Sequence, residues 1–186
     1  MSDINTFKNK LKGGGARANQ FKVVMNFPTW ASIDGATNDF AFFCTATTTP
    51  ASTVAEVPVA FRGRTLYVAG DRSFATWDTT IINDTDFKIY RAVEKWLNGM
   101  NDLKFNTSSH LDPDSYQMDA TIKHLDRNNA VLKEWTFRGC MPTALPGIAL
   151  DYSDNDKIET FDVTWRYQWF EMTGAGESYG TGAAGL

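Results

Sequence analysis

The sequence has few of the residues that most often do chemistry, with two cysteines and two histidines among 186 residues. Cys44 and Cys140 do not make a disulfide framework in a chain of this length, and we expect both thiols to be free and buried. His110 and His124 lack neighbours at zinc-ligand spacing, and no nucleophile elbow or phosphate-binding loop occurs. The sequence therefore predicts no catalytic residue, no metal site and no cofactor.

A basic excess and long apolar runs are also missing. The chain has 18 Lys and Arg against 22 Asp and Glu, for a net charge of −4, whereas proteins that hold nucleic acid by its phosphates normally have a surplus of cations. Stable DNA or RNA binding is therefore disfavoured, although transient contact stays open. No run approaches about 18 apolar residues, and residues 1–15 have no apolar signal-peptide core. We expect synthesis in a cytoplasm and no membrane span.

Aromatic residues are abundant, at 13% of the chain, which favours half-buried β-sheet surfaces and protein interfaces. We expect a mainly β fold, an antiparallel β-sandwich or barrel, with one α-helix at about 86–100. That helix has apolar residues at spacings of three and four, with Asp84 or Thr85 as its N-cap and Gly99 at its exit.

The stretch from Phe42 to Asp84 predicts strands and turns. Val57, Val59 and Phe61 alternate before the reversal at 62–64, and the alternation resumes beyond it, which is typical of a β-hairpin. A second break is predicted at 69–72. The further predicted strands are residues 21–27, 40–46, 74–82, 116–123, 130–138 and 158–170.

The two ends of the chain differ from the middle. Residues 3–12 have the spacing of a short amphipathic helix that ends at the three glycines 13–15, and residues 173–186 contain five glycines and no periodicity. We therefore divide the chain into an N-terminal arm (1–15), one β domain (16–172) and a flexible C-terminal tail (173–186). Exposed sheet edges in such a domain tend to recruit another chain, which favours oligomerisation.

Two charged clusters are not predicted to be catalytic or metal-binding sites. The acidic run 151–156 has oxygen ligands at calcium-loop spacing, but Asp156 stands where the loop needs glycine, so we interpret the run as a solvated turn. Arg62, Arg64 and Arg72 surround one hairpin, where ion pairs between subunits or plain solvation are expected.

Three blocks of the sequence together resemble one family. They are ARANQFKVV (16–24), PVAFRGRTLYVAGDRSFATW (58–77) and RGCMPTALPGIALDYSDNDKIETFDVTW (138–165), with VAGDRSF (68–74) the strongest match and IIND (81–84) next. The chain resembles the tail tube proteins of contractile-tailed bacteriophages over residues 16–171, more weakly in the loops 28–39 and 101–115.

The resemblance implies a β-barrel-like sandwich that assembles as hexameric rings, stacked into a hollow tube inside a contractile sheath. The genome passes through this conduit, and no active site is implied. The expected partners are other copies of the chain, the sheath, baseplate and tape-measure proteins, and double-stranded DNA in transient contact, all within a virion tail. The assembly-interface candidates are Arg62, Arg64, Asp71, Arg72 and Asp84, and the candidates for the tube lumen are Asp119 and Glu134.

Two alternatives remain open at this stage. The same fold is used by the tubes of type VI secretion systems and phage-derived bacteriocins. An aromatic-rich β-sandwich can also be a carbohydrate-binding module, with Trp30, Trp77 or Trp135 as stacking platforms, and that role requires exposed, coplanar tryptophans.

Overall fold

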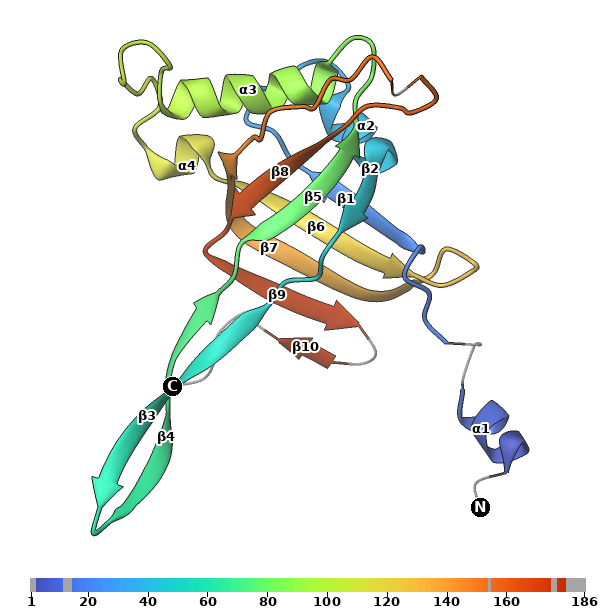
Figure 1. The fold of residues 1–186 in the computed structure, drawn as a ribbon, viewed down its shortest axis with the longest axis vertical. Helices are drawn as coiled ribbons and strands as arrows, with labels where there is room; N and C mark the ends of the chain where they lie inside the picture. Colours follow the sequence, from blue (N-terminus) through green and yellow to red (C-terminus); the bar gives the residue numbers. More distant parts are fainter. Residues whose placement is uncertain (1–2, 12–14, 154, 175–176, 180–186) are drawn as a thin grey trace.

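The protein is mainly β, as expected. The computed structural model describes residues 3–11, 15–153, 155–174 and 177–179 (Figure 1). The helices are α1 (Ile4–Lys10), α2 (Ala36–Phe43), α3 (Lys88–Met100) and α4 (Pro113–Tyr116). The strands are β1 (Phe21–Met25), β2 (Cys44–Thr47), β3 (Ser52–Phe61), β4 (Arg64–Phe74), β5 (Trp77–Ile82), β6 (Met118–Leu125), β7 (Val131–Ala144), β8 (Thr160–Arg166), β9 (Trp169–Gly174) and β10 (Glu177–Tyr179).

One antiparallel sheet of eight strands forms the body, in the order β1-β6-β7-β8-β5-β2, with β9 paired to β7 and β10 to β9. Strand β7 belongs to both halves of this sheet, because residues 133–138 pair with β9 and residues 141–144 pair with β8. Gly139 lies at the change of partner with a φ of 62°, a left-handed conformation that glycine adopts without strain. The sheet therefore folds over on itself, and the predicted sandwich or barrel class is confirmed.

The core between the two halves is largely aromatic. The Trp165 ring centroid lies 5.7 Å from that of Trp96, 6.0 Å from that of Trp77 and 6.2 Å from that of Phe40. Buried indoles need acceptors for their N–H groups, and each one has an acceptor here: Trp165 donates to Thr79 Oγ1 (2.9 Å), Trp96 to the Tyr116 carbonyl (2.8 Å) and Trp77 to Thr47 Oγ1 (2.7 Å). These bonds fix the orientation of the three largest core side chains.

Helix α3 confirms the predicted helix, although it begins two residues later than expected. The N-cap residue is Phe87, so the predicted N-cap at Asp84 or Thr85 is wrong, although the Asp84 carboxylate accepts a hydrogen bond from the Lys88 backbone N–H at the start of the helix (3.0 Å). Gly99 is not the exit, because the helix continues to Met100. A Cβ at position 99 would overlap the Trp30 ring, so this glycine lets the Trp30 loop pack against the helix.

The predicted strand at 40–46 is wrong for its first half. Residues 36–43 form helix α2, and only the last residues join β2. Gly35, with a φ of 88°, precedes the helix, and Ala36 and Phe40 are both buried one helical turn apart. The Phe40 ring contacts the rings of Phe27 and Trp165 edge-on. Because Ala36 and Phe40 would share a face in a helix and in a strand alike, it is these ring contacts that favour the helix, and tertiary packing overrides the strand-like composition.

The predicted break at 69–72 is also wrong, because β4 runs through it to Phe74. Gly70 and Asp71 together oppose Ala55 between the pairs Val54–Arg72 and Glu56–Ala69, which is a β-bulge. The strand that we placed at 74–82 begins at Trp77, after two residues outside the ladder. The residues 69–72, which we predicted to break the strand, therefore form a β-bulge within a longer hairpin.

The single strand predicted at 158–170 is divided into β8 and β9. The chain passes from one half of the sheet to the other at residues 167–168. There the Gln168 N–H donates to the Arg138 carbonyl (2.9 Å) beside the bend of β7. The alternating residues Phe161, Val163, Trp165 and Tyr167 are buried, but Trp169, the next in the alternation, is 49% exposed. Since β7 turns at Gly139, its partner strand has to break at the matching position.

Both chain ends contain some regular structure. Helix α1 confirms the short N-terminal helix, and Asp3 accepts from the Asn5 N–H (3.4 Å) as its cap. Residues 173–174 belong to β9, and residues 177–179 form β10 on its edge. Residues 175–176 and 180–186, for which we predicted flexibility, lie outside the described residues. Across the described ranges, no helix is long and apolar enough to cross a membrane.

Candidate assembly surfaces

The long hairpin β3–β4 projects from the body as a two-stranded ribbon (Figure 1). Arg62 and Gly63 form its turn, with φ values of 45° and 82°, the left-handed pair that a tight hairpin turn requires. This confirms the predicted reversal. The register pairs Val57 with Val68 and Val59 with Leu66, so these four side chains share one face of the ribbon.

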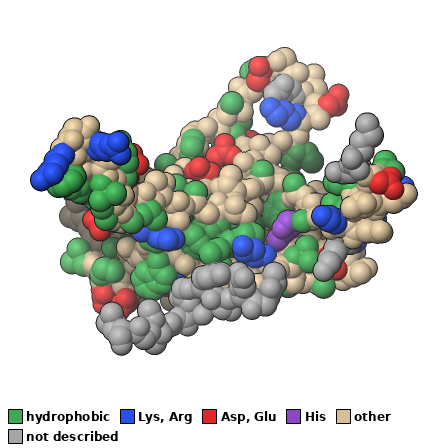
Figure 2. Space-filling model, turned by 90° about the horizontal axis from the view of Figure 1, so that it is seen from below, with side chains coloured by type: hydrophobic (Ala, Val, Ile, Leu, Met, Phe, Trp, Pro, Cys, Tyr) green, Lys and Arg blue, Asp and Glu red, His purple; other side chains and the backbone are tan. Residues whose placement is uncertain are grey.

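This ribbon is exposed along almost its whole length. Every residue of β3 is exposed, and the Phe61 side chain near the tip is 66% exposed. Figure 2 shows hydrophobic and basic side chains together on the ribbon, at the left of the view. An isolated two-stranded hairpin is marginally stable in water. Seven large apolar side chains of the ribbon are exposed: Val54, Val57, Val59, Phe61, Leu66, Tyr67 and Val68. Covering the exposed halves of these side chains would contribute about 5–10 kcal/mol, which favours a covering partner.

Four of the five interface candidates lie on this hairpin. Arg62 and Arg64 flank the tip, while Asp71 and Arg72 lie at the bulge. In the part of the chain that the structure describes, one side-chain hydrogen bond involves these four residues, and it joins Arg72 Nη1 to Ser52 Oγ (3.4 Å). Asp84 is not brought together with the others, because it lies just before α3, where it accepts from the Lys88 N–H. Its place in an interface stays a prediction.

A second surface is the outward face of β1, β6, β7 and β9. Arg138 on β7 lies at its centre and donates two hydrogen bonds to the Glu171 carboxylate (3.0 and 2.9 Å). The same guanidinium donates to Asp119, which also accepts from the Gly139 N–H (3.3 Å). The bonds to Glu171, and then those to Asp119, raise the pKa of Arg138 above its ordinary value. One cation thus joins three strands through two carboxylates.

The two lumen candidates, Asp119 and Glu134, lie on this same face. Glu134 forms an ion pair with Lys123 on the neighbouring strand (3.2 Å), and Asp119 pairs with Arg138. The sequence alone pointed to acidic side chains but missed their basic partners. The only available signal was the alternation of β6 and β7, which puts Lys123 and Arg138 on the outward face. Each predicted acidic residue is therefore paired with a basic neighbour, although Arg138 is shared between Asp119 and Glu171.

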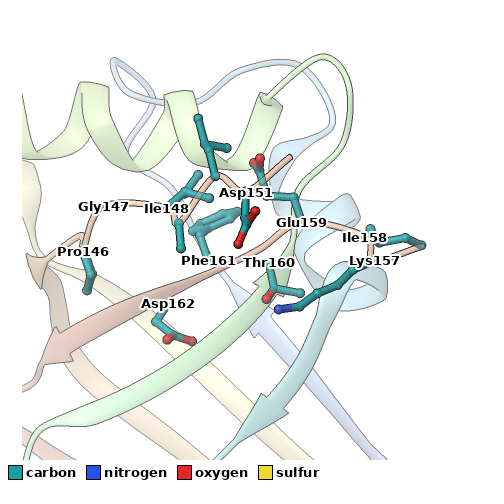
Figure 3. Close-up of a pocket in the computed structure, with 12 residues that line it drawn as sticks. Pro146, Gly147, Ile148, Asp151, Lys157, Ile158, Glu159, Thr160, Phe161 and Asp162 are labelled. Carbon is teal, nitrogen blue, oxygen red and sulfur yellow. The ribbon is translucent and has the colours of Figure 1, made fainter. Parts of the chain in front are cut away.

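A third surface lies at the end of the molecule where α3 is found. Residues 146–151 and the beginning of β8 enclose a pocket of about 370 Å³ (Figure 3). Asp151, Glu159 and Asp162 are among its lining residues. The Asp151 carboxylate accepts from the N–H (2.8 Å) and Oγ (2.7 Å) of Ser153, and these two bonds lower the pKa of Asp151. The acidic run is thus a turn, as interpreted from the sequence.

The tryptophans do not form a stacking platform for sugars. Trp77 is only 1% exposed and stacks on Phe137 at 4.4 Å. Trp30 is partly buried and stacks on His110 at 4.0 Å, while the Lys133 ammonium lies over the Trp135 ring at 5.4 Å. The three indoles serve three separate packing roles. The platform interpretation is wrong for Trp77, which is buried, while Trp30 and Trp135 each pack against another side chain of the protein.

Comparison with known proteins gives a consistent result. The family model for the phage tail tube protein matches residues 16–173. The tail tube protein of Serratia phage KSP90 is 32% identical over 169 residues, which is 90% of this chain and 95% of that protein.

Two solved structures share the fold at low sequence identity. A chain of the six-fold symmetrised baseplate of the anti-feeding prophage aligns with a TM-score of 0.64 and 14% identity, over 87% of this chain and 97% of that one. A chain of the extended sheath–tube complex of an extracellular contractile injection system aligns with a TM-score of 0.58 and 13% identity, over 90% of this chain and 97% of that one.

Proposed function

Because the chain belongs to the phage tail tube protein family, we propose that it is the structural subunit of a contractile phage's tail tube. Copies form hexameric rings, and the rings stack into a hollow conduit within the virion. The protein acts by assembly and not by catalysis. Its synthesis takes place in the host cytoplasm.

The exposed β3–β4 hairpin is the observation that carries this proposal. An uncovered two-stranded ribbon with exposed apolar side chains is unfavourable in a monomeric protein, whereas a neighbouring copy can cover it. The strand path also ends at β1 and β2, and ring closure would pair such edges with neighbouring subunits. Ring-on-ring stacking is open-ended, which is the geometry that makes a filament.

The sheath and the baseplate are the proposed protein partners outside the tube. The structural neighbours come from a baseplate and from a sheath–tube complex, and a tube of this fold inside a sheath would meet both. A tape-measure protein and then double-stranded DNA are the proposed contents of the tube.

The outward face with Asp119 and Glu134 is the proposed lining of the lumen. A duplex binds where free cations can replace its counterions, and on this face Lys123 and Arg138 are held by carboxylates. Such a lumen surface would let DNA move through the tube without binding tightly to it. A map of the assembled tube with both acidic residues on the sheath-facing surface would contradict this assignment.

Electron microscopy of the purified protein tests the proposal. We expect annular particles or tubes, and a variant with residues 54–72 replaced by a short turn should stay folded but fail to form tubes. The matched control shortens the exposed 126–129 turn, which should leave tubes intact. A wild-type protein that stays monomeric at every concentration would refute the proposed function.

An injection-system tube is the nearest alternative machine. The structural neighbours with that role are 14% identical or less, which supports only the shared fold, whereas the phage relative is 32% identical. A gene for a tape-measure protein next to capsid genes would favour the phage assignment.

A further inference from the structure

The hairpin tip and the acidic pocket lie at opposite ends of the molecule. Figure 1 has the longest axis vertical, with the tip of β3–β4 at the bottom and the segment leading into β8 at the top, next to α3. In an open-ended stack, one end of each copy meets the opposite end of a copy in the next ring. If the proposed function holds, the tip therefore points toward the pocket end of a neighbour.

The charges at these two ends are complementary. The distal hairpin, residues 57–68, contains Arg62 and Arg64 and no acidic residue. The segment 146–162 contains five acidic residues and one lysine. Within the described residues, neither arginine has an ion pair, and the Arg62 guanidinium lies over its neighbour Phe61 at 5.4 Å. The two basic side chains are thus available to a partner.

The acidic residues of the pocket are held in place by uncharged groups. Asp151 accepts from Ser153, Asp162 accepts from Thr80 Oγ1 (2.6 Å), and Glu159 accepts from Asn83. Such bonds orient a carboxylate without adding a positive charge, and each carboxylate oxygen can accept a further bond. The pocket is lined by these three carboxylates and one cationic side chain, Lys157. An arginine that enters the pocket would find oriented acceptors with planar, bidentate geometry.

Apolar side chains surround both charged centres. Leu150, Tyr152 and Ile158 are exposed around the pocket, with Leu150 at 84%. Phe61 and Leu66 are exposed near the tip, on the face that also carries Val59. Since large exposed apolar side chains at both ends gain by mutual burial, the two surfaces match in polarity as well as in charge.

We propose that the Arg62–Arg64 tip of each subunit docks in the 146–162 pocket of a second copy in the adjacent ring. The two arginines bind the carboxylates of Asp151 and Asp162, and Phe61 packs against Leu150 and Ile158 of that copy. The contact is heterologous, so every ring presents tips on one side and pockets on the other. This defines the stacking polarity of the tube and rests on the proposed tube function.

Disulfide cross-linking tests the contact directly. A mixture of Arg62→Cys and Asp151→Cys proteins should give disulfide-linked dimers when tubes assemble and should give none in monomers. The background is clean, because Cys44 and Cys140 are buried. Arg127→Cys, at the exposed β6–β7 turn, is the matched control and should give no dimer with Asp151→Cys.

Charge reversal tests the energetics. Arg62→Glu/Arg64→Glu should raise the concentration needed for tubes by about tenfold or more and leave the fold intact, while Arg127→Glu should not. Asp151→Lys/Asp162→Lys should restore stacking of the Arg62→Glu/Arg64→Glu protein in mixed or combined variants. Tubes with normal stability and no Arg62–Asp151 cross-link would overturn this inference while the tube function stands. A wild-type protein without rings or tubes would instead refute the proposed function.

Discussion

Replacing Gly99 by alanine should destabilise the protein, although alanine is the better helix former. In an exposed helix interior this change stabilises by about 1 kcal/mol. Here the added methyl group would occupy the position of the Trp30 ring. The ring also stacks on His110 at 4.0 Å and donates to the Ser115 carbonyl at 2.9 Å, so it cannot move aside without losing these contacts.

The expected balance is unfavourable. Forcing an extra methyl group into a packed site costs about 1–3 kcal/mol, and losing the Trp30 hydrogen bond costs about 1 kcal/mol more. After subtracting the gain in helix propensity, we expect a net loss of about 1–3 kcal/mol in the free energy of unfolding. Urea denaturation, followed by tryptophan fluorescence below the concentration at which tubes form, measures this difference.

The same substitution in a protein that lacks the Trp30 ring makes the test stringent. In a Trp30→Ala protein the clash is gone, so Gly99→Ala should become stabilising by about 0.5–1 kcal/mol. Gly147→Ala is the control, because a Cβ there meets nothing within 4 Å. If Gly99→Ala stabilises the wild type, or if its effect keeps the same sign without Trp30, the assigned role of this glycine is refuted.

Three further predictions concern buried polar groups. Thr79→Val should cost about 1–3 kcal/mol, because it leaves the Trp165 N–H buried without an acceptor, whereas Thr80→Val at the surface should cost much less in the same denaturation assay. Cys44 and Cys140 should resist iodoacetamide in the native protein and react after unfolding, as mass spectrometry would detect; rapid native labelling would contradict their burial. Burial raises the pKa of the Cys44 thiol from 9.0 to about 12. The unfolded chain therefore loses this proton first, and the free energy of unfolding should fall as pH rises from 9.0 toward 12. A Cys44→Ala protein should have a flatter pH profile, and equal profiles would exclude the thiol as the cause.

The sequence predicted those elements whose pattern does not depend on distant contacts. The alternation on both sides of Arg62 and Gly63 specifies the β3–β4 hairpin, because a strand has a period of two and this turn favours left-handed residues. The apolar stripe of α3 specifies a helix in the same way. The proposed assembly surface rests on the same signals, since the predicted hairpin is long and carries exposed apolar side chains.

The sequence failed where two local structures fit equally well. Phe40 can be buried from a strand or from a helix, and the contacts of its ring with Phe27 and Trp165 select the helix. The alternation from Phe161 to Trp169 continues through residues 167–168, yet the strand breaks there because its partner β7 bends at Gly139. In both places the local sequence does not specify the structure, and contacts with residues far away in the chain decide it.

The amino-acid order alone thus determined the β class, the helix at α3, the β3–β4 hairpin and the lack of a net basic charge, because each depends on short-range periodicity or on composition. Only the tertiary structure decided that Asp119 and Glu134 pair with Arg138 and Lys123, and that the basic tip and the acidic pocket lie at opposite ends. Charge pairing and polarity along the molecular axis are relations between segments far apart in the chain, and the fold sets them by bringing strands together in one register and direction.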